Sequence, residues 1–496
     1  MPDHLNYRSI AKANAIFGGV QVYTILIRII RTKLVAVLLG AEGMGIMGLF
    51  QSTIDLVKRS TDFGIQSSAV RDVAIAHSSD DTVQISRTYS VISKFVWLTG
   101  LLGTFVTFIF AGSLSMMTFS TYDYTNSFRI LSVVLLISQL TVSNQVMLQG
   151  MRKIKILAMN SIVGGTVGLL LVIPLYYLWR IKAIVPAILL TYIITYIVSL
   201  YSFKKQHVEK IYIPFKDVFR QGRQMIVLGF MLSLTSFMDS IQTYLVKIFI
   251  SHSGDVSEVG LYHAGFSIIL TYAGLVFSSI STDYYPRLAG VNEDQEKRND
   301  VINDQMEIML LTLLPMIVFF LLSAKFLIPL LFTEEFLSIK TMSCLIAVGM
   351  ILRAISWCPG YLYIVKGDSK LYLTIYVATF FITTSFYLGL YYLWGLDGIG
   401  VAFIGTYIIC SASAIVITDR YYHYIVRKET WLIIGVTILI SSVALVLSCF
   451  QNVLSGSLLF FLFGYSCIYS YHGLNERLEL GKLFRNKFYN DRNSIH

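Results

Sequence analysis

The sequence predicts an all-α polytopic membrane protein. Of its 496 residues, 55% are hydrophobic and only 14% are charged, whereas a soluble chain usually carries about 25% charged residues. The mean hydropathy is +0.67. The apolar residues also lie in runs of about 20, the length that a helix needs to cross a bilayer. This composition excludes a disordered chain, a coiled coil and a disulfide-rich secreted scaffold.

Fourteen apolar ranges are long enough to be transmembrane helices. Strands of a membrane barrel would be about half as long and would alternate between polar and apolar residues. The predicted spans, separated by short polar turns, are 11–39, 44–72, 89–112, 128–149, 156–179, 183–203, 225–250, 261–287, 308–331, 341–364, 371–394, 398–420, 430–450 and 455–474.

The distribution of basic residues predicts the orientation. An even number of spans places both termini on one side. The connections on that side carry 22 Lys and Arg, whereas the opposite loops carry only Arg180, Lys182 and Lys340. Because basic loops stay in the cytoplasm, we expect both termini to be cytoplasmic. The net charge of +10 therefore reflects membrane orientation, and no nucleic-acid partner is expected.

Signatures of catalysis or metal binding are missing from the sequence. The five cysteines lie in apolar stretches without a CxxC pair, and there is no Walker or HExxH sequence. The segment 43–48 matches GxGxxG, but it lies between two predicted spans, where it indicates a turn and close helix packing. We expect no catalytic residue, no metal and no cofactor.

Similar motifs recur at nearly constant spacing. The segments 149–153 and 366–370 both fit x-Gly-x-x-Lys at an offset of 217, and Gly45 and Gly260 each open a span at an offset of 215. This indicates two six-helix lobes followed by two extra helices. The linker between the lobes is either a short interfacial helix or an ordinary basic connection. The predicted parts are the lobe 1–203, the linker 204–224, the lobe 225–423, the helices 424–474 and the basic tail 475–496.

Charged residues inside the first two spans are the most informative feature. A charge at the bilayer centre costs about 2.5–3.5 kcal/mol on insertion scales, so these residues must face other helices or a water-filled cavity. Five cations against two anions leave a net charge of +3, which suits an anionic ligand. The alternative is a structural ladder of ion pairs. The residues are Arg28, Arg31 and Lys33 in the first span and Asp55, Lys58, Arg59 and Asp62 in the second.

Depth in the membrane can be estimated from the turn between these spans. Arg28 and Asp55 each lie about 12 residues, or roughly 18 Å, from it, so we expect them to be neighbours. In the second half, Asp239 and Arg353 lie near mid-span, either as functional residues or as a packed structural pair. Lys247 lies near an outer end, where we expect it to snorkel.

Taken together, the chain resembles the polysaccharide-transporter branch of the multidrug/oligosaccharidyl-lipid/polysaccharide (MOP) exporter superfamily, the O-antigen translocases (Wzx-type flippases). The likeness extends over nearly the whole chain. It is carried by the cationic first span, the turn Leu39–Gly45, Phe63-Gly64, Gln149-Gly150, the segment Lys366–Lys370 and the segment Gly398–Phe403.

This resemblance implies a transporter without enzyme activity. Its two lobes would surround a central cavity that opens alternately to each side. The substrate would be an oligosaccharide linked by pyrophosphate to undecaprenol, moved from the cytoplasmic to the periplasmic leaflet of the bacterial inner membrane. Membrane lipid, a coupling ion (H⁺ or Na⁺) and other polysaccharide assembly proteins would be its partners.

The resemblance and the charges together indicate site residues. Arginine forks bind phosphate oxygens well, and a carboxylate can carry a proton or Na⁺. The pyrophosphate-binding candidates are Arg28, Arg31, Lys58, Arg59 and Arg353, and the ion-coupling candidates are Asp55, Asp62 and Asp239.

Two other functions remain as alternatives. A multidrug cation antiporter of the same superfamily would favour an acidic or aromatic cavity, which the net charge of +3 opposes. A membrane-embedded polysaccharide polymerase or ligase would need a sizeable outer loop with catalytic residues, and no outer loop exceeds about 15 residues.

Overall fold

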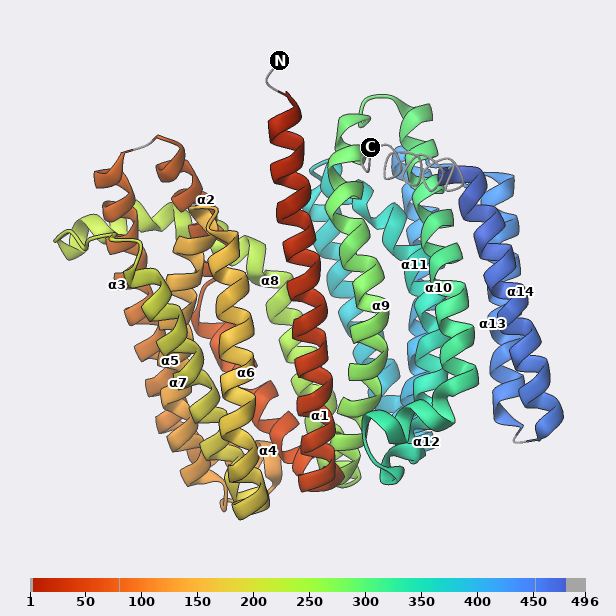
Figure 1. Ribbon diagram of the computed structural model, residues 1–496, viewed down its shortest axis with the longest axis horizontal. Helices are drawn as coiled ribbons and strands as arrows, with labels where there is room; N and C mark the ends of the chain where they lie inside the picture. Colours follow the sequence, from red (N-terminus) through yellow and green to blue (C-terminus); the bar gives the residue numbers. More distant parts are fainter. Residues whose placement is uncertain (1–2, 80, 451, 479–496) are drawn as a thin grey trace, which may run out of the picture. The chain divides into compact units, whose positions relative to one another are not determined.

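A computed structural model describes residues 3–79, 81–450 and 452–478, and this part of the chain is helical, without strands (Figure 1). This confirms the all-α prediction. The helices are α1 (Asp3–Thr61), α2 (Ile65–Ser78), α3 (Thr82–Ile109), α4 (Ala111–Phe119), α5 (Thr125–Gly150), α6 (Ile154–Trp179), α7 (Ile184–Lys204), α8 (Phe215–Ser253), α9 (Val256–Gly290), α10 (Gln295–Leu331), α11 (Lys340–Val365), α12 (Ser369–Tyr422), α13 (Lys428–Cys449) and α14 (Val453–Leu478), with 3₁₀ turns η1 (Arg180–Ala183) and η2 (Glu334–Ile339).

Nine stretches of the described residues are long and apolar enough to cross a membrane, so the chain is a multi-pass membrane protein. Two of these stretches, Ile154–Lys204 and Ser369–Tyr422, each contain two of the predicted spans. The charged helices α1 and α8 are not among the nine. Every predicted span overlaps at least one helix, and the helices are consistent with the fourteen predicted spans.

Glycines in left-handed conformations interrupt the two longest helices. Non-helical backbone at Gly40 (φ 67°) divides α1 between the first two predicted spans. Gly395 (φ 59°) divides α12 between the eleventh and twelfth in the same way. A side chain would be strained at such φ values, whereas glycine is not. The sequence predicted both interruptions as turns between spans.

Several predicted boundaries are wrong. The range 44–72 is two helices, because α1 ends at Thr61 and a turn with left-handed Phe63 and Gly64 precedes α2. The predicted outer connection after residue 112 contains most of α4. No separate interfacial helix is present in the linker, since residues 207–214 are non-helical and α8 begins at Phe215. Residues 479–496 of the predicted basic tail lie outside the described residues.

The chain divides into two compact units. The first unit comprises Met1–Gly260 with Leu331–Thr333, and the second comprises Leu261–Leu330 and Glu334–His496. In the first unit, α5 packs against α3 and α7, and α1 packs against α6 and α8. In the second unit, α11 packs against α12 and α13. The predicted lobes remain a prediction.

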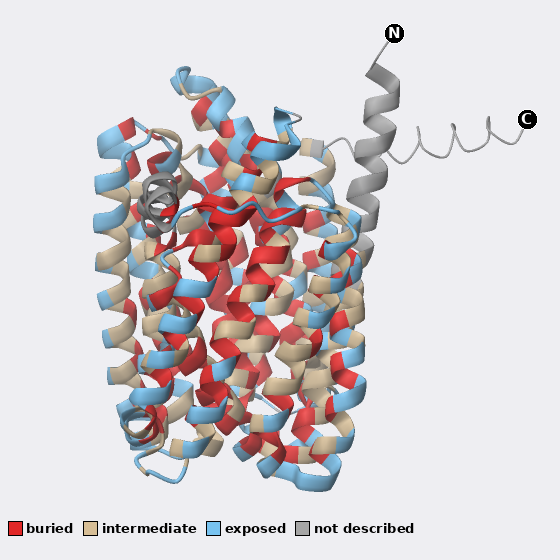
Figure 2. Cartoon of the chain, turned by 90° about the vertical axis from the view of Figure 1, so that its left-hand side faces the viewer, coloured by how far each residue is buried: buried red, intermediate tan, exposed pale blue. Residues whose placement is uncertain are grey.

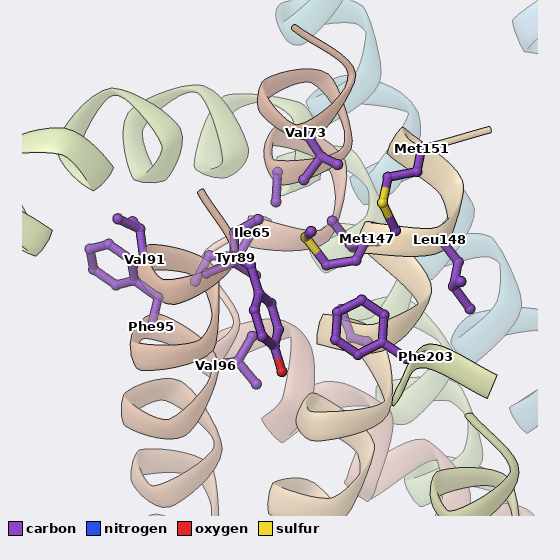
Figure 3. Close-up of a cluster of buried hydrophobic side chains, with 14 of the residues drawn as sticks. Ile65, Val73, Tyr89, Val91, Phe95, Val96, Met147, Leu148, Met151 and Phe203 are labelled. Carbon is purple, nitrogen blue, oxygen red and sulfur yellow. The ribbon is translucent and has the colours of Figure 1, made fainter. Parts of the chain in front are cut away.

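A cluster of buried apolar side chains holds the helices of the first unit together (Figure 3). It joins Val73 of α2, Phe95 of α3, Met147 of α5 and Phe203 of α7. Figure 2 shows the same pattern along the helices, with buried residues on the faces that meet other helices and exposed residues elsewhere. The cluster therefore fixes α5 beside α7, which matters for the cavity described below.

In the second unit, one buried carboxylate joins three helices. Glu307 of α10 is 2% exposed. Its carboxylate accepts a hydrogen bond from Arg477 Nε of α14 at 2.5 Å and one from the hydroxyl of Thr430 of α13. The guanidinium of Arg427, just before α13, lies 3.6 Å away. The last two helices are thus tied to α10 by ion pairs as well as by apolar packing.

The helices α5 and α11 end in the same turn. At the end of α5 the amide of Lys153 donates to the carbonyl of Leu148 at 2.8 Å, and after α11 the amide of Asp368 donates to that of Tyr363 at 3.0 Å. The residue before the donor has a left-handed backbone in both turns, Arg152 with φ 56° and Gly367 with φ 73°. This is the geometry of a Schellman motif. Residues at equivalent positions of the two turns are 215 apart in the sequence. The predicted offset of 217, which aligned Gly150 with Gly367, was therefore too large by two residues.

Candidate functional site

The charged stripe of α1 faces a cavity inside the first unit. The cavity has a volume of about 290 Å³ and lies between α1, α5 and α7. Two cations, Arg31 and Lys58, line it from α1 together with Gln51. The facing wall is formed by Ser138, Thr141, Val142 and Gln145 of α5 and by Ile188, Thr191, Tyr192 and Thr195 of α7.

An amide bridge connects α1 to α7 at this cavity. Gln51 Nε2 donates to Asp55 Oδ1 at 3.1 Å, one turn further along α1, and lies 3.2 Å from the hydroxyl oxygen of Tyr192. Gln51 and Asp55 lie one turn apart on the same face of α1. Since a shared amide orients a carboxylate and a phenol together, the bridge fixes this edge of the cavity.

Lys247 of α8 is a buried cation next to the site, although it does not line the cavity. Its side chain is only 5% exposed, and Nζ donates to the backbone carbonyl of Gly48 on α1 at 3.0 Å. Asp55 is the carboxylate with which it interacts electrostatically. The expected snorkelling is therefore wrong, because the face of α8 that carries Lys247 packs on α1. The depth of Lys247 in the membrane does not determine its partner, because the partner depends on which face of α8 packs against α1.

The expected pair of Arg28 and Asp55 is not formed. Arg28 lies on an exposed part of α1, and the charged neighbours of Asp55 are Lys58, Lys247 and Arg59. These three cations interact electrostatically with Asp55, but none of them lies within 4 Å of its carboxylate. The distance from the turn gives the depth of each residue in the membrane, but it does not give the direction in which each side chain points from its helix.

Three cations of α1 lie without a close carboxylate among the described residues. Within the described part of the chain, Arg31, Lys58 and Arg59 have no carboxylate within 4 Å. Arg31 instead lies beside the phenols of Tyr176 and Tyr192. A cationic cavity wall without ion-pair partners can bind an anion by charge-assisted hydrogen bonds.

The other predicted site residues lie elsewhere. Asp62 is 3% exposed, and its Oδ1 accepts a hydrogen bond from the amide of Gly64 at 2.8 Å, in the turn between α1 and α2. Asp239 lies on an exposed part of α8. Arg353 belongs to the second unit, on α11, where its guanidinium stacks on the rings of Phe277 (5.4 Å) and Tyr407 (5.8 Å).

Comparison with known proteins gives the family of the chain. A family model described as "Polysaccharide biosynthesis protein" matches residues 34–341. A Shigella flexneri protein whose name refers to O-antigen transport is 24% identical over 354 residues, which are 68% of this chain and 81% of that protein. The lipid III flippase of Escherichia coli (strain K12) is 23% identical over 403 residues, 81% of this chain and 96% of the relative.

A solved structure shares the fold. The lipid II flippase MurJ, in an inward closed conformation, superposes with a TM-score of 0.70 at 14% sequence identity. The match covers 94% of this chain and 99% of that one. The resemblance inferred from the sequence is thereby confirmed, and the relatives are transporters and flippases, not enzymes.

Proposed function

Because the chain belongs to the polysaccharide biosynthesis protein family, we propose that it is a flippase for an undecaprenyl-pyrophosphate-linked oligosaccharide, such as an O-antigen repeat unit. It moves this lipid from the cytoplasmic to the periplasmic leaflet of the bacterial inner membrane. The observation that carries the proposal is the cationic, hydroxyl-rich cavity lined by α1, α5 and α7.

The cations of this cavity fit a pyrophosphate. Arg31 and Lys58 supply only hydrogen-bond donors, and their charges are not neutralised by a carboxylate within 4 Å in the described residues. Charge-assisted bonds to phosphate oxygens are about twice as strong as neutral ones. Arg59 adds positive charge next to Lys58, and a cationic drug would be repelled by the same groups. The charge therefore favours a lipid-linked anion over the substrates of a multidrug antiporter.

Alternating access of two six-helix lobes is the proposed transport mechanism. Its support is the internal repeat. The turns that end α5 and α11 are equivalent at an offset of 215, and Gly45 and Gly260, which open predicted spans, are separated by the same offset. Two lobes of like construction can rock against each other to expose a site to one side and then to the other.

Depletion of the protein tests the proposed function. We expect the undecaprenyl-linked oligosaccharide to accumulate, detected by mass spectrometry of the lipid fraction, and to stay inaccessible to impermeant labels in spheroplasts. Re-expression of the wild-type chain is the control and should restore display at the outer leaflet. Unchanged display, with no accumulated lipid-linked sugar, would refute the proposal.

Labelling of the connections before and after α9 tests the orientation. In a variant whose five native cysteines are replaced by alanine, Ser253→Cys should react with an impermeant maleimide added from outside, and Glu293→Cys should react only after the membrane is opened. Both residues are exposed, so accessibility depends on the side of the membrane alone. The reverse pattern would place the termini in the periplasm and contradict the 22-to-3 distribution of basic residues.

A further inference from the structure

Resting on the proposed function, we infer that the α5–α7 wall of the cavity recognises the first sugar of the substrate, the one bonded to the pyrophosphate. The cavity of the first unit has two chemically different walls. Donor groups face it from α1, and acceptor oxygens face it from the opposite side. The facing wall carries four aliphatic hydroxyls, together with the side chains of Gln145 and Tyr192. The hydroxyls are those of Ser138 and Thr141 on α5 and of Thr191 and Thr195 on α7.

The hydroxyl groups of α7 already use their protons. Thr191 Oγ1 donates to the carbonyl of Ala187 at 2.8 Å, and Thr195 Oγ1 donates to that of Thr191 at 2.8 Å. A threonine hydroxyl has one proton and two lone pairs. Because the proton is bonded to the residue's own helix, the oxygen can offer only lone pairs to a ligand.

The hydroxyl groups of α5 also donate their protons to carbonyl groups of their own helix. Thr141 Oγ1 donates to the carbonyl of Ile137 at 2.9 Å, and Ser138 Oγ donates to that of Leu135 at 2.9 Å. The four aliphatic hydroxyls of the wall are therefore acceptors toward the cavity. While these helix bonds persist, each oxygen can accept a proton from the hydroxyl of a sugar but does not donate to a phosphate oxygen.

The two cationic side chains complement this wall. Arg31 and Lys58 donate and cannot accept, so they suit phosphate oxygens. Two further side chains of the wall can both donate and accept. Gln145 makes no side-chain hydrogen bond within the described residues, and the phenol oxygen of Tyr192 faces Gln51 Nε2 at 3.2 Å. The division between donors and acceptors thus orients a sugar pyrophosphate with its phosphates toward α1.

The volume limits how much of the substrate this cavity receives. Pockets for drug-sized ligands measure about 300–1,000 Å³, and this cavity, at about 290 Å³, lies just below that range. It can hold one sugar next to a phosphate but not a whole oligosaccharide. The apolar side chains of Val142 and Ile188 also line it and can pack against the carbon-bound hydrogens of a sugar ring.

Binding measurements with two lipids test the inference. The probes are undecaprenyl pyrophosphate and the same lipid carrying the oligosaccharide that accumulates in depleted cells, each titrated into the purified protein in nanodiscs. We expect the wild type to bind the glycosylated lipid about three- to tenfold more tightly, since one neutral hydrogen bond contributes roughly a two- to tenfold change in affinity. The variant Thr191→Val/Thr195→Val removes two of the four acceptor hydroxyls and should lose most of this preference.

The matched control is Thr99→Val on α3. Thr99 is also buried and also donates to its own helix, at Val96, but it does not line the cavity, so the preference should persist. Should the double variant not fold, Ser138→Ala provides the same comparison with one hydroxyl removed. If the wild type binds both lipids equally, or the wall variants keep the preference, the inference is overturned while the proposed function stands. If the wild type binds neither lipid, the proposed function itself fails.

Discussion

Replacing Arg31 and Lys58 together with glutamine is expected to lower affinity for undecaprenyl pyrophosphate by about a hundred- to ten-thousandfold. Each charge-assisted hydrogen bond contributes about 1.5–3 kcal/mol, and every 1.4 kcal/mol is a factor of ten. Both cations line the same cavity, and the described residues place no carboxylate within 4 Å of either. Titration of the lipid into the purified variant gives the affinity, and surface glycan display at matched protein levels gives transport.

Two comparisons separate ligand binding from general loss of charge. Arg129→Gln removes an exposed arginine outside the cavity and should leave both readouts unchanged. Arg31→Lys keeps the charge but loses the planar fork that binds two phosphate oxygens at once, so an intermediate loss is expected. Undiminished affinity and display in the double glutamine variant would show that these cations only stabilise the helices.

Asp55→Asn is expected to lower the free energy of unfolding by about 1–3 kcal/mol, because the buried ammonium of Lys247 loses the carboxylate that balances its charge. The substitution leaves the buried ammonium of Lys247 with the carbonyl of Gly48 but without its carboxylate. The double variant Asp55→Asn/Lys247→Met removes both charges and should regain most of the stability. Denaturant unfolding of the purified protein in bicelles measures the difference.

This experiment also tests whether Asp55 couples transport to an ion gradient. If the carboxylate only balances Lys247, the stable double variant should regain transport as well. If it binds the coupling ion, transport should stay lost although the protein is folded. Lys325→Met, which removes an exposed lysine, is the control for the lysine replacement. Wild-type stability in Asp55→Asn would contradict the electrostatic role of the pair.

The spans were predictable because each needs a long apolar run, and apolar runs are visible in a sequence. The ends of the helices were harder to predict from the sequence. The helix α8 begins at Phe215 and α10 begins at Gln295, each at least ten residues before the predicted span, since a helix can continue into water where its residues are polar. The turn at Phe63 and Gly64 was hidden inside an apolar range, and only its left-handed backbone identifies it.

The cavity was predictable in part. Arg31 and Lys58 stood out because charge in a membrane span is costly. Thr191 and Thr195 did not, because a threonine that donates to its own helix is common in membrane helices and carries no charge. Lys247 was visible but was assigned to the wrong surroundings, because its partner depends on how α8 packs against α1. Polarity identifies which residues need a partner, whereas packing decides which partner they obtain.

The carboxylate of Glu307 also has a consequence for the order in which the chain is made. Synthesis proceeds from the N-terminus, so α10 leaves the ribosome long before its partners. Thr430 follows Glu307 by 123 residues and Arg477 follows it by 170. Until then a glutamate that is almost completely buried in the finished protein has neither of these partners. A chain that stops before Arg427 would therefore leave this acid on α10 without any of its three partners, so α10 reaches its final surroundings only after α13 and α14 have been made.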